Sequence, residues 1–195
     1  GDHAPEAIVR GAIDAAAEFG VQIVLVGRGE AILKSLSAEG LDTLPKGVEI
    51  ANAEDVVEMT DDPANVVRTR RESSMVVGLR MLSEGAGDAF ISAGSTGALL
   101  SAATLVVKRV KGIRRAALCP EIPTKTGSTL LIDCGANAEC TPEFLAQFAV
   151  LGSIYAQRVQ GKAQPKVALL NIGTEERKGT QLQKDTFAML QKAQD

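Results

Sequence analysis

The chain has 195 residues, of which 45% are apolar but only 3% aromatic, and a formal net charge of −3 at neutral pH. This charge argues against general nucleic-acid binding, which needs a basic surface to neutralise phosphates. The three cysteines form no C-x-x-C pair and the chain has one histidine, so it lacks the ligands of a zinc site and fits a reducing cytosol.

No apolar run approaches the roughly 18 residues that cross a bilayer, and the start shows no signal-peptide pattern. The sequence therefore predicts a soluble, cytoplasmic protein. It begins with Gly1 and not with methionine, and regular structure is predicted almost at once, so we expect an initiating segment to be missing.

Short runs rich in β-branched residues alternate with amphipathic stretches along the chain. This order predicts βαβ units, an α/β fold with a mainly parallel sheet flanked by helices. Pro5 and Pro142 stand at helix-opening positions, with Thr141 as an N-cap, and the polar stretch 52–73 is predicted to be a loop with a short helix. The predicted strands are 21–26, 48–51, 89–92, 116–119, 129–133 and 167–171, and the predicted helices are 5–19, 30–38, 74–84, 96–108, 142–157 and 181–193.

His3 is the one side chain whose ordinary pKa lies near neutrality, so it is the natural proton shuttle of this chain. Asp2 beside it can orient the ring, although a histidine near a terminus is often only solvated. Gly27-Arg28-Gly29 follows a predicted strand, but the third glycine of a dinucleotide motif would fall on Ile32. That nucleotide fingerprint is therefore incomplete.

The loop Gly94-Ser95-Thr96-Gly97 joins a predicted strand to a predicted helix. Free amides and two hydroxyls at the positive end of a helix can bind a phosphate group. An ordinary turn, in which serine or threonine caps the helix, explains the same residues. Beyond that helix lies a basic cluster, which either complements the helix dipole or steers an acidic protein: Lys108, Arg109, Lys111, Arg114 and Arg115.

Two more polar loops follow predicted strands. Asp133 and Asn137 place an acid and an amide at a strand end, where Asn137 can donate to an oxyanion, although an Asx turn is the alternative. Lys178 lies in a charged loop after the strand 167–171, the position where α/β proteins hold anions, although the loop can also be a solvated charge cluster. Its Lys-Gly-Thr order is not that of a P-loop.

Taken together, these loops resemble the phosphate acyltransferases of phospholipid synthesis, the PlsX family, over nearly the whole chain. Ser95 stands where that family usually carries asparagine, and Cys134 where valine is common. The matching residues are Gly1-Asp2-His3-Ala4-Pro5, Arg68, Ser73-Ser74-Met75, Ser92-Ala93-Gly94-Ser95-Thr96-Gly97-Ala98, Arg115, Pro123-Thr124, Asp133-Cys134-Gly135-Ala136-Asn137, Asn171-Ile172-Gly173-Thr174-Glu175 and Lys178-Gly179.

The resemblance implies transfer of a fatty acyl group from acyl carrier protein to inorganic phosphate, which gives acyl phosphate without a cofactor or a metal. It implies a three-layer fold of the isopropylmalate dehydrogenase and phosphotransacetylase kind, over a single unit 1–195 that lacks the start of its first strand and its C-terminal part. That missing part would carry much of a homodimer contact and a peripheral membrane contact.

In this hypothesis Lys178, His3 and Asn137 are catalytic. Lys178 binds the phosphate and the oxyanion, Asn137 polarises the carbonyl, and His3 gives a proton to the departing thiol. The loop Gly94, Ser95, Thr96 and Gly97 binds phosphate, and the basic cluster binds the acidic acyl carrier protein. Three alternatives stay open: a phosphotransacetylase-type enzyme that uses coenzyme A thioesters, an isopropylmalate-type dehydrogenase, and a noncatalytic module that binds acyl carrier protein.

Overall fold

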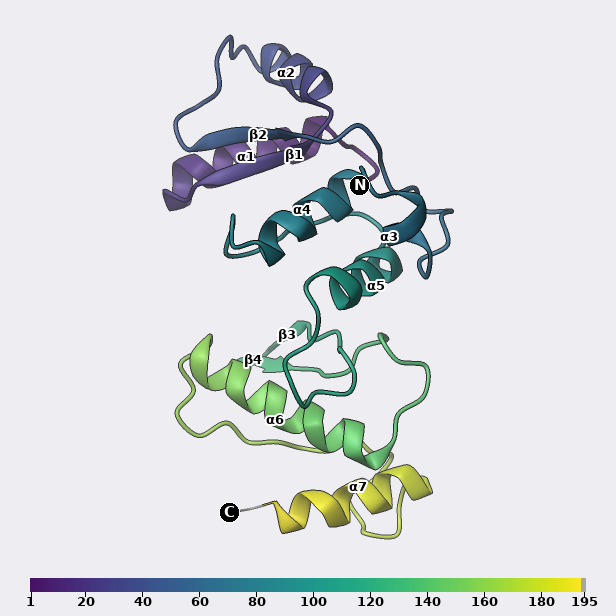
Figure 1. The fold of residues 1–195 in the computed structure, drawn as a ribbon. Coiled ribbons are helices and arrows are strands. Elements are labelled where there is room, and N and C mark those ends of the chain that lie inside the picture. The colour runs from purple at the N-terminus through teal and green to yellow at the C-terminus, as the bar shows by residue number, and fades with distance from the viewer. Residues whose placement is uncertain (194–195) are drawn as a thin grey trace. The chain divides into compact units, whose positions relative to one another are not determined.

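The computed structural model describes residues 1–193. The chain folds into two compact units, Gly1–Lys108 and Arg109–Asp195 (Figure 1). The sequence predicts a single structural unit over residues 1–195. Whether the two compact units join into one stays a prediction. None of the helices in the described part of the chain combines the length and the apolar character needed to cross a bilayer.

The first half of unit 1 is a parallel strand pair covered by two helices (Figure 1). The strands pair in register from Ile23 opposite Val48 to Gly27 opposite Asn52. Apolar side chains from all four elements, among them Val9, Leu25 and Ile32, form one buried cluster. The elements are α1 (Glu6–Phe19), β1 (Ile23–Gly27), α2 (Gly29–Ala38) and β2 (Val48–Asn52).

The second half of unit 1 is helical, and its elements are α3 (Val66–Thr69), α4 (Ser74–Ser83) and α5 (Thr96–Val106). A second core cluster joins all three, and Val66, Leu79 and Ala98 are buried in it. The buried Ser73 caps α4 by accepting a hydrogen bond from the Val76 amide at 3.4 Å. The short helix expected between residues 52 and 73 is therefore confirmed as α3.

Gly78 of α4 is needed because the Phe90 ring packs directly against it. A Cβ at this position would lie 2.8 Å from the Phe90 Cδ2 atom and closer still to Cε2. We expect Gly78→Ala to lower the free energy of unfolding by about 1–2 kcal/mol, because overpacking outweighs the gain in helix propensity.

Urea denaturation of the variant would measure this loss. Gly11→Ala in α1 is the matched control, since nothing lies within 4 Å of a Cβ there. That control is expected to gain about 0.5–1 kcal/mol from helix propensity alone. Equal gains for both variants would show that Phe90 does not restrict position 78.

Unit 2 contains an antiparallel hairpin and two longer helices. The hairpin pairs Glu121 with Leu130, and the helices pack against each other with Phe148 and Thr186 buried. Thr141 caps the longer helix by accepting from the Phe144 amide at 3.4 Å, as predicted. The elements are β3 (Glu121–Thr124), β4 (Gly127–Leu130), α6 (Pro142–Arg158) and α7 (Gln181–Lys192).

Every predicted long helix is present within two residues of its expected ends, but the strand predictions were only partly right. The strands 21–26 and 48–51 are confirmed as β1 and β2. The segments 89–92, 116–119 and 167–171 are not strands among the described residues, and 129–133 overlaps only the end of β4, in an antiparallel hairpin.

The physical reason for these errors is that a β-rich run becomes a strand only when a neighbouring strand completes its hydrogen-bond ladder. Ile91 and Leu170 lie in two of the unpaired segments and are 93% and 78% exposed. The structure is therefore α/β, with one pair of parallel strands among residues 1–193.

Candidate active site

The N-terminal segment lies against the predicted phosphate loop in unit 1. A side chain at Gly1 would meet Ala93, whose Cβ and carbonyl oxygen lie 3.2 and 3.3 Å from the position of that Cβ. His3 follows two residues later, and its carbonyl accepts from the Ala7 amide at 3.0 Å as α1 begins. Its exposed imidazole has no hydrogen bond within residues 1–193. The fold therefore brings the histidine segment and this loop to one edge of unit 1.

The loop before α5 is shaped by two serine hydroxyls. Ser92 Oγ accepts from the Gly94 amide at 3.2 Å, and Ser95 Oγ accepts from the Ala98 amide at 3.3 Å. Ser95 is only 8% exposed, so it serves as the N-cap of α5. Ser95 therefore caps the helix, as in the ordinary turn considered above as the alternative to a phosphate site. Its hydroxyl oxygen already accepts the hydrogen bond from the Ala98 amide.

The amides of Thr96 and Gly97 are left for an anion. No partner for either N–H occurs in the described part of the chain, and the Thr96 side chain is exposed beside them. A side chain at position 97 would lie 3.3 Å from Pro63 Cγ, so glycine keeps the turn close to the preceding loop. Two free amides at the positive end of a helix form an anion-binding element.

Asp133 organises the loop that follows β4 in unit 2. Its carboxylate accepts from the amides of Leu118 at 2.9 Å, Ala136 at 3.0 Å and Asn137 at 2.8 Å, and from the Asn137 side chain at 2.9 Å. Partial burial raises the pKa of Asp133, but these hydrogen bonds outweigh it and hold the pKa below its usual value. The carboxylate is therefore ionised near neutral pH, and the hydrogen bonds that it accepts all come from nearby residues of the same chain.

Asn137 is held by the same loop. Its Nδ2 donates to Asp133 and also to the Ala116 carbonyl, both at 2.9 Å. Two acceptors on one side fix the orientation of the amide, because a flipped group would turn its oxygen toward them. Both N–H groups are then engaged, and the amide oxygen is the part left free. A donor role toward an oxyanion would require one of these bonds to break.

A tight turn presents Lys178. Asn171 Nδ2 donates to the Lys178 carbonyl at 3.1 Å, and the Lys178 amide donates to the Glu175 carbonyl at 2.9 Å. Gly179 has a φ of 88°, and a Cβ there would lie 2.5 Å from Asn171 Oδ1, so a side chain would strain the backbone and displace Asn171. The stem of the lysine passes close to Gly173, whose Cβ would lie 3.0 Å from Lys178 Cγ.

The turn therefore holds the backbone of Lys178, whereas the ammonium group at the end of its side chain is free. The side chain is exposed, and no ion pair of Lys178 occurs within residues 1–193 despite the nearby Glu175 and Glu176. An unpaired cation on an ordered turn can bind a phosphate or a developing oxyanion.

The basic cluster follows the end of α5 in the chain, and its role toward a partner stays a prediction. Helix α5 ends at Val106, two residues earlier than predicted, and Lys108 follows in a left-handed conformation with a φ of 72°. The other members belong to unit 2. The Arg109 guanidinium donates to the Ile113 carbonyl at 3.2 Å, and Arg115 lies 5.7 Å from the centre of the Phe144 ring.

No basic residue lies in the last turn of α5, so a helix-dipole role is ruled out for that turn. Lys108, Lys111 and Arg114 are exposed and remain available to a partner.

The whole chain, residues 1–195, matches the fatty acid synthesis protein family. The chain belongs to this family. Its curated relatives include proteins named phosphate acyltransferase, so the resemblance expected from the loops is confirmed. One relative, from Desulfitobacterium hafniense (strain Y51), is 48% identical over 193 residues, which are 99% of this chain and 57% of that protein.

Two further relatives carry the same name. The Desulforamulus reducens protein is 46% identical over 192 residues, 98% of this chain and 57% of its own length. The Herpetosiphon aurantiacus protein is 43% identical over 195 residues, 100% of this chain and 52% of its own. The chain thus spans little more than half the length of these family members.

Two of the three cysteines, Cys119 and Cys140, are poor nucleophiles in this structure. Burial raises the pKa of the Cys119 thiol, and burial together with the charge of Asp133 raises the pKa of Cys140. Both thiols are therefore protonated near neutral pH. This disfavours an acyl intermediate linked to Cys119 or Cys140.

The candidate residues fall into two groups. His3 and the loop Gly94–Gly97 lie in unit 1, whereas Asn137 and Lys178 lie in unit 2. Local turns hold the residues within each group. That the two groups form one active site stays a prediction. The supporting roles of Gly173 and Gly179 were missed from the sequence, although a glycine on either side of a candidate lysine was a usable signal.

Proposed function

We propose that this chain takes part in the transfer of a fatty acyl group from acyl carrier protein to inorganic phosphate, which forms acyl phosphate for phospholipid synthesis. The relatives named phosphate acyltransferase support the reaction class. The observation that carries the proposal is the exposed Lys178 ammonium on its ordered turn, with no ion pair within residues 1–193. The free amides of Thr96 and Gly97 supply a second anion-binding element.

The proposed reaction needs little covalent help from the protein. A phosphate oxygen attacks the thioester carbonyl, the new C–O bond forms, and the C–S bond then breaks as a tetrahedral oxyanion collapses. Phosphate is already an anion, and an ordinary thiol has a pKa of about 8.5, so neither the nucleophile nor the leaving group is poor. Positioning and charge stabilisation then supply most of the rate.

Each candidate residue has a role in this scheme. Lys178 binds the attacking phosphate and the oxyanion, and the amides of Thr96 and Gly97 bind the remaining phosphate oxygens. His3 protonates the departing sulfur. Asn137 and Asp133 keep the neighbouring loop in shape, and the free amide oxygen of Asn137 can accept a hydrogen bond from a protonated phosphate.

The proposal requires the two units to join. We infer a three-layer arrangement like that of isopropylmalate dehydrogenase and phosphotransacetylase. A cytoplasmic homodimer with a peripheral membrane contact belongs to the same proposal. Sedimentation with and without vesicles would test both properties.

A phosphate-dependent hydroxamate assay tests the reaction. Acyl carrier protein and coenzyme A thioesters are each incubated with the protein, with and without phosphate, and acyl phosphate is trapped with hydroxylamine. The expected result is phosphate-dependent product with the carrier-protein donor. Product only from coenzyme A would favour the phosphotransacetylase alternative, and a thermal shift with nicotinamide cofactor would favour the dehydrogenase. Binding of the carrier protein without formation of acyl phosphate would favour the alternative of a noncatalytic module.

The exposed lysines of the basic cluster are expected to steer the acidic carrier protein. Reversing charge in the double variant Lys108→Glu and Lys111→Glu should raise the KM for acyl carrier protein about tenfold at low salt and flatten its salt dependence. Steady-state kinetics at two ionic strengths measure both effects. The control, Lys34→Glu with Lys46→Glu, makes the same charge change at exposed positions of unit 1. A similar effect in the control would assign the change to net charge alone.

A further inference from the structure

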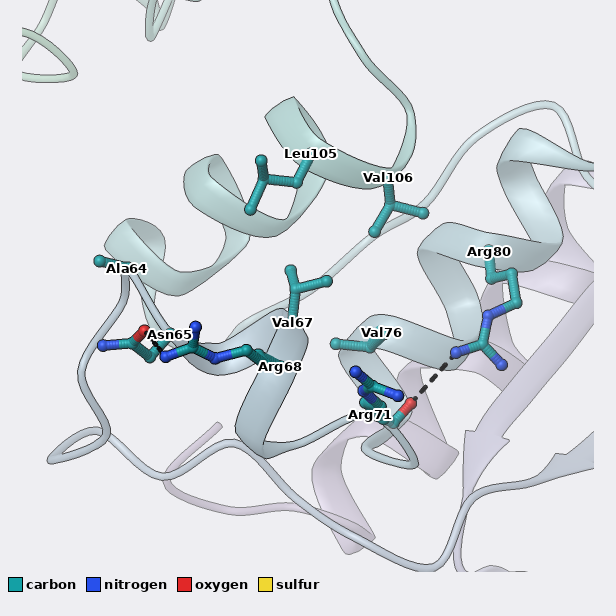
Figure 2. A pocket seen from close by; sticks show the side chains of 9 residues that line it. All are labelled: Ala64, Asn65, Val67, Arg68, Arg71, Val76, Arg80, Leu105 and Val106. Carbon is teal, nitrogen blue, oxygen red and sulfur yellow. Dashed lines mark hydrogen bonds between the residues drawn. The ribbon is translucent and has the colours of Figure 1, made fainter.

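A hollow of about 530 Å³ lies between α3, α4 and α5 of unit 1 (Figure 2). Sites for small molecules commonly have volumes of roughly 300–1,000 Å³. One part of its wall is apolar and comes from all three helices, with Val67 on α3, Val76 on α4 and Leu105 on α5. Val76 is buried, whereas Leu105 is 57% exposed and forms the open side of that wall.

The other part of the wall carries three guanidinium groups, those of Arg68, Arg71 and Arg80. Val76 and Arg80 are one helical turn apart on α4, so both face the same hollow. The Arg68 side chain donates to the Asn65 side-chain oxygen at 3.2 Å, and Arg80 donates to the Arg71 carbonyl at 3.4 Å (Figure 2). Both acceptors are neutral, so the three positive charges are not balanced by these contacts.

The neighbouring Arg70 shows the contrast. Its guanidinium binds Asp61 through two contacts of 3.0 Å and Asp55 at 3.2 Å. Within residues 1–193, every ion pair involves either Arg70 or Arg10. Arg70 thus uses Asp55 and Asp61, and no ion pair within residues 1–193 involves an arginine of the hollow.

We propose that this hollow binds an anionic amphiphile, a molecule with a phosphate or carboxylate head and a single alkyl chain. The planar guanidinium groups match the oxygens of such a head, and the chain covers the surface of Val67, Val76 and Leu105. An inorganic anion would leave the apolar wall in water, and a neutral lipid would leave the arginines uncompensated. The proposal goes beyond the transfer reaction and stands without it, since the hollow uses none of the candidate catalytic residues.

Calorimetric titration of the protein with dodecyl phosphate, below its critical micelle concentration, tests the proposal directly. Dodecyl phosphate is expected to bind at least tenfold more tightly than inorganic phosphate or dodecanol. Laurate distinguishes the two head groups, and binding of either acid supports the site. Equal affinity for dodecanol, or no binding of either acid, would overturn it.

Substitutions in the wall of the hollow test whether the ligand binds there. Arg71→Gln and Arg80→Gln are each expected to weaken dodecyl phosphate binding about tenfold, since each removes a charge-assisted hydrogen bond. Leu105→Ser should weaken dodecyl phosphate more than octyl phosphate, because the longer chain covers more of that wall. Lys34→Gln removes one exposed charge on α2 of the same unit and should change nothing.

The candidate active site is the main competitor for this ligand, because an alkyl phosphate resembles an acyl phosphate. Lys178→Ala is therefore included, and it should leave the calorimetric affinity unchanged even if it abolishes transfer. Loss of binding in Lys178→Ala, with full binding in Arg71→Gln, would assign the ligand to the loops and refute the hollow. Failure of the transfer assay has no bearing on this comparison.

Discussion

Replacing Lys178 with alanine is expected to lower acyl-phosphate formation by about 100- to 1,000-fold, which is the usual cost of removing one stabilising group from an oxyanion site. The loss follows from the position of the ammonium group, which the turn at Gly173 and Gly179 holds in the open without an ion pair among the described residues. The far-ultraviolet circular dichroism spectrum should not change, because the side chain is exposed.

The phosphate-dependent hydroxamate assay measures this loss, and Lys184→Ala is its control. Lys184 is an exposed lysine on α7 of the same unit, so its removal makes the same change of charge and size. Full activity in Lys178→Ala would remove this lysine from the site. Lys178→Arg should recover part of the rate, because the positive charge is kept while its geometry changes.

Asp133→Asn is expected to lower the free energy of unfolding by about 1.5–3 kcal/mol at neutral pH, the range for hydrogen bonds to a charged group. The carboxylate accepts from three backbone amides and from Asn137, and an amide side chain cannot accept all four. The loop that carries Asn137 should therefore loosen. The measurement is the urea midpoint of unfolding at several pH values.

The pH dependence has a definite sign. The folded-state pKa of Asp133 is depressed, so its contribution to stability is complete above the unfolded value of about 3.9. It is lost as the pH falls through the lower folded value. The difference between wild type and Asp133→Asn should thus be full at pH 6–7 and shrink below about pH 4. Glu139→Gln, at an exposed position of the same unit, should show no such change. A difference that persists at low pH would mean that charge is not its source.

The helices could be predicted from the sequence because their signals are local. Thr141 and Pro142 mark the start of α6 within two residues, and the apolar period of α1 needs no distant partner. Strands depend on neighbours far away in the chain. The apolar segments around Ile91 and Leu170 contain good strand formers, yet no residue of the described chain pairs with them.

The candidate site divides in the same way. The exposed Lys178 was predictable because a lysine followed an apolar run, but the engagement of the Asn137 amide was not. That depends on the Ala116 carbonyl, 21 residues away. The arginine-lined hollow could not be found either, since Arg70 lies between Arg68 and Arg71 in sequence and only the fold shows which of them has carboxylate partners.

The turn that presents Lys178 also sets which neighbouring positions can vary. Gly179 is fixed by its left-handed backbone and by its closeness to Asn171, whereas the side chains of Glu176 and Arg177 are exposed and make no ion pair within the described residues. In a saturation library screened for folding alone, variants substituted at positions 171 and 179 would therefore be lost. Positions 176 and 177 would accept many residues. Intolerance at Lys178 in a screen for activity, but not in the folding screen, would separate chemistry from architecture within one short segment.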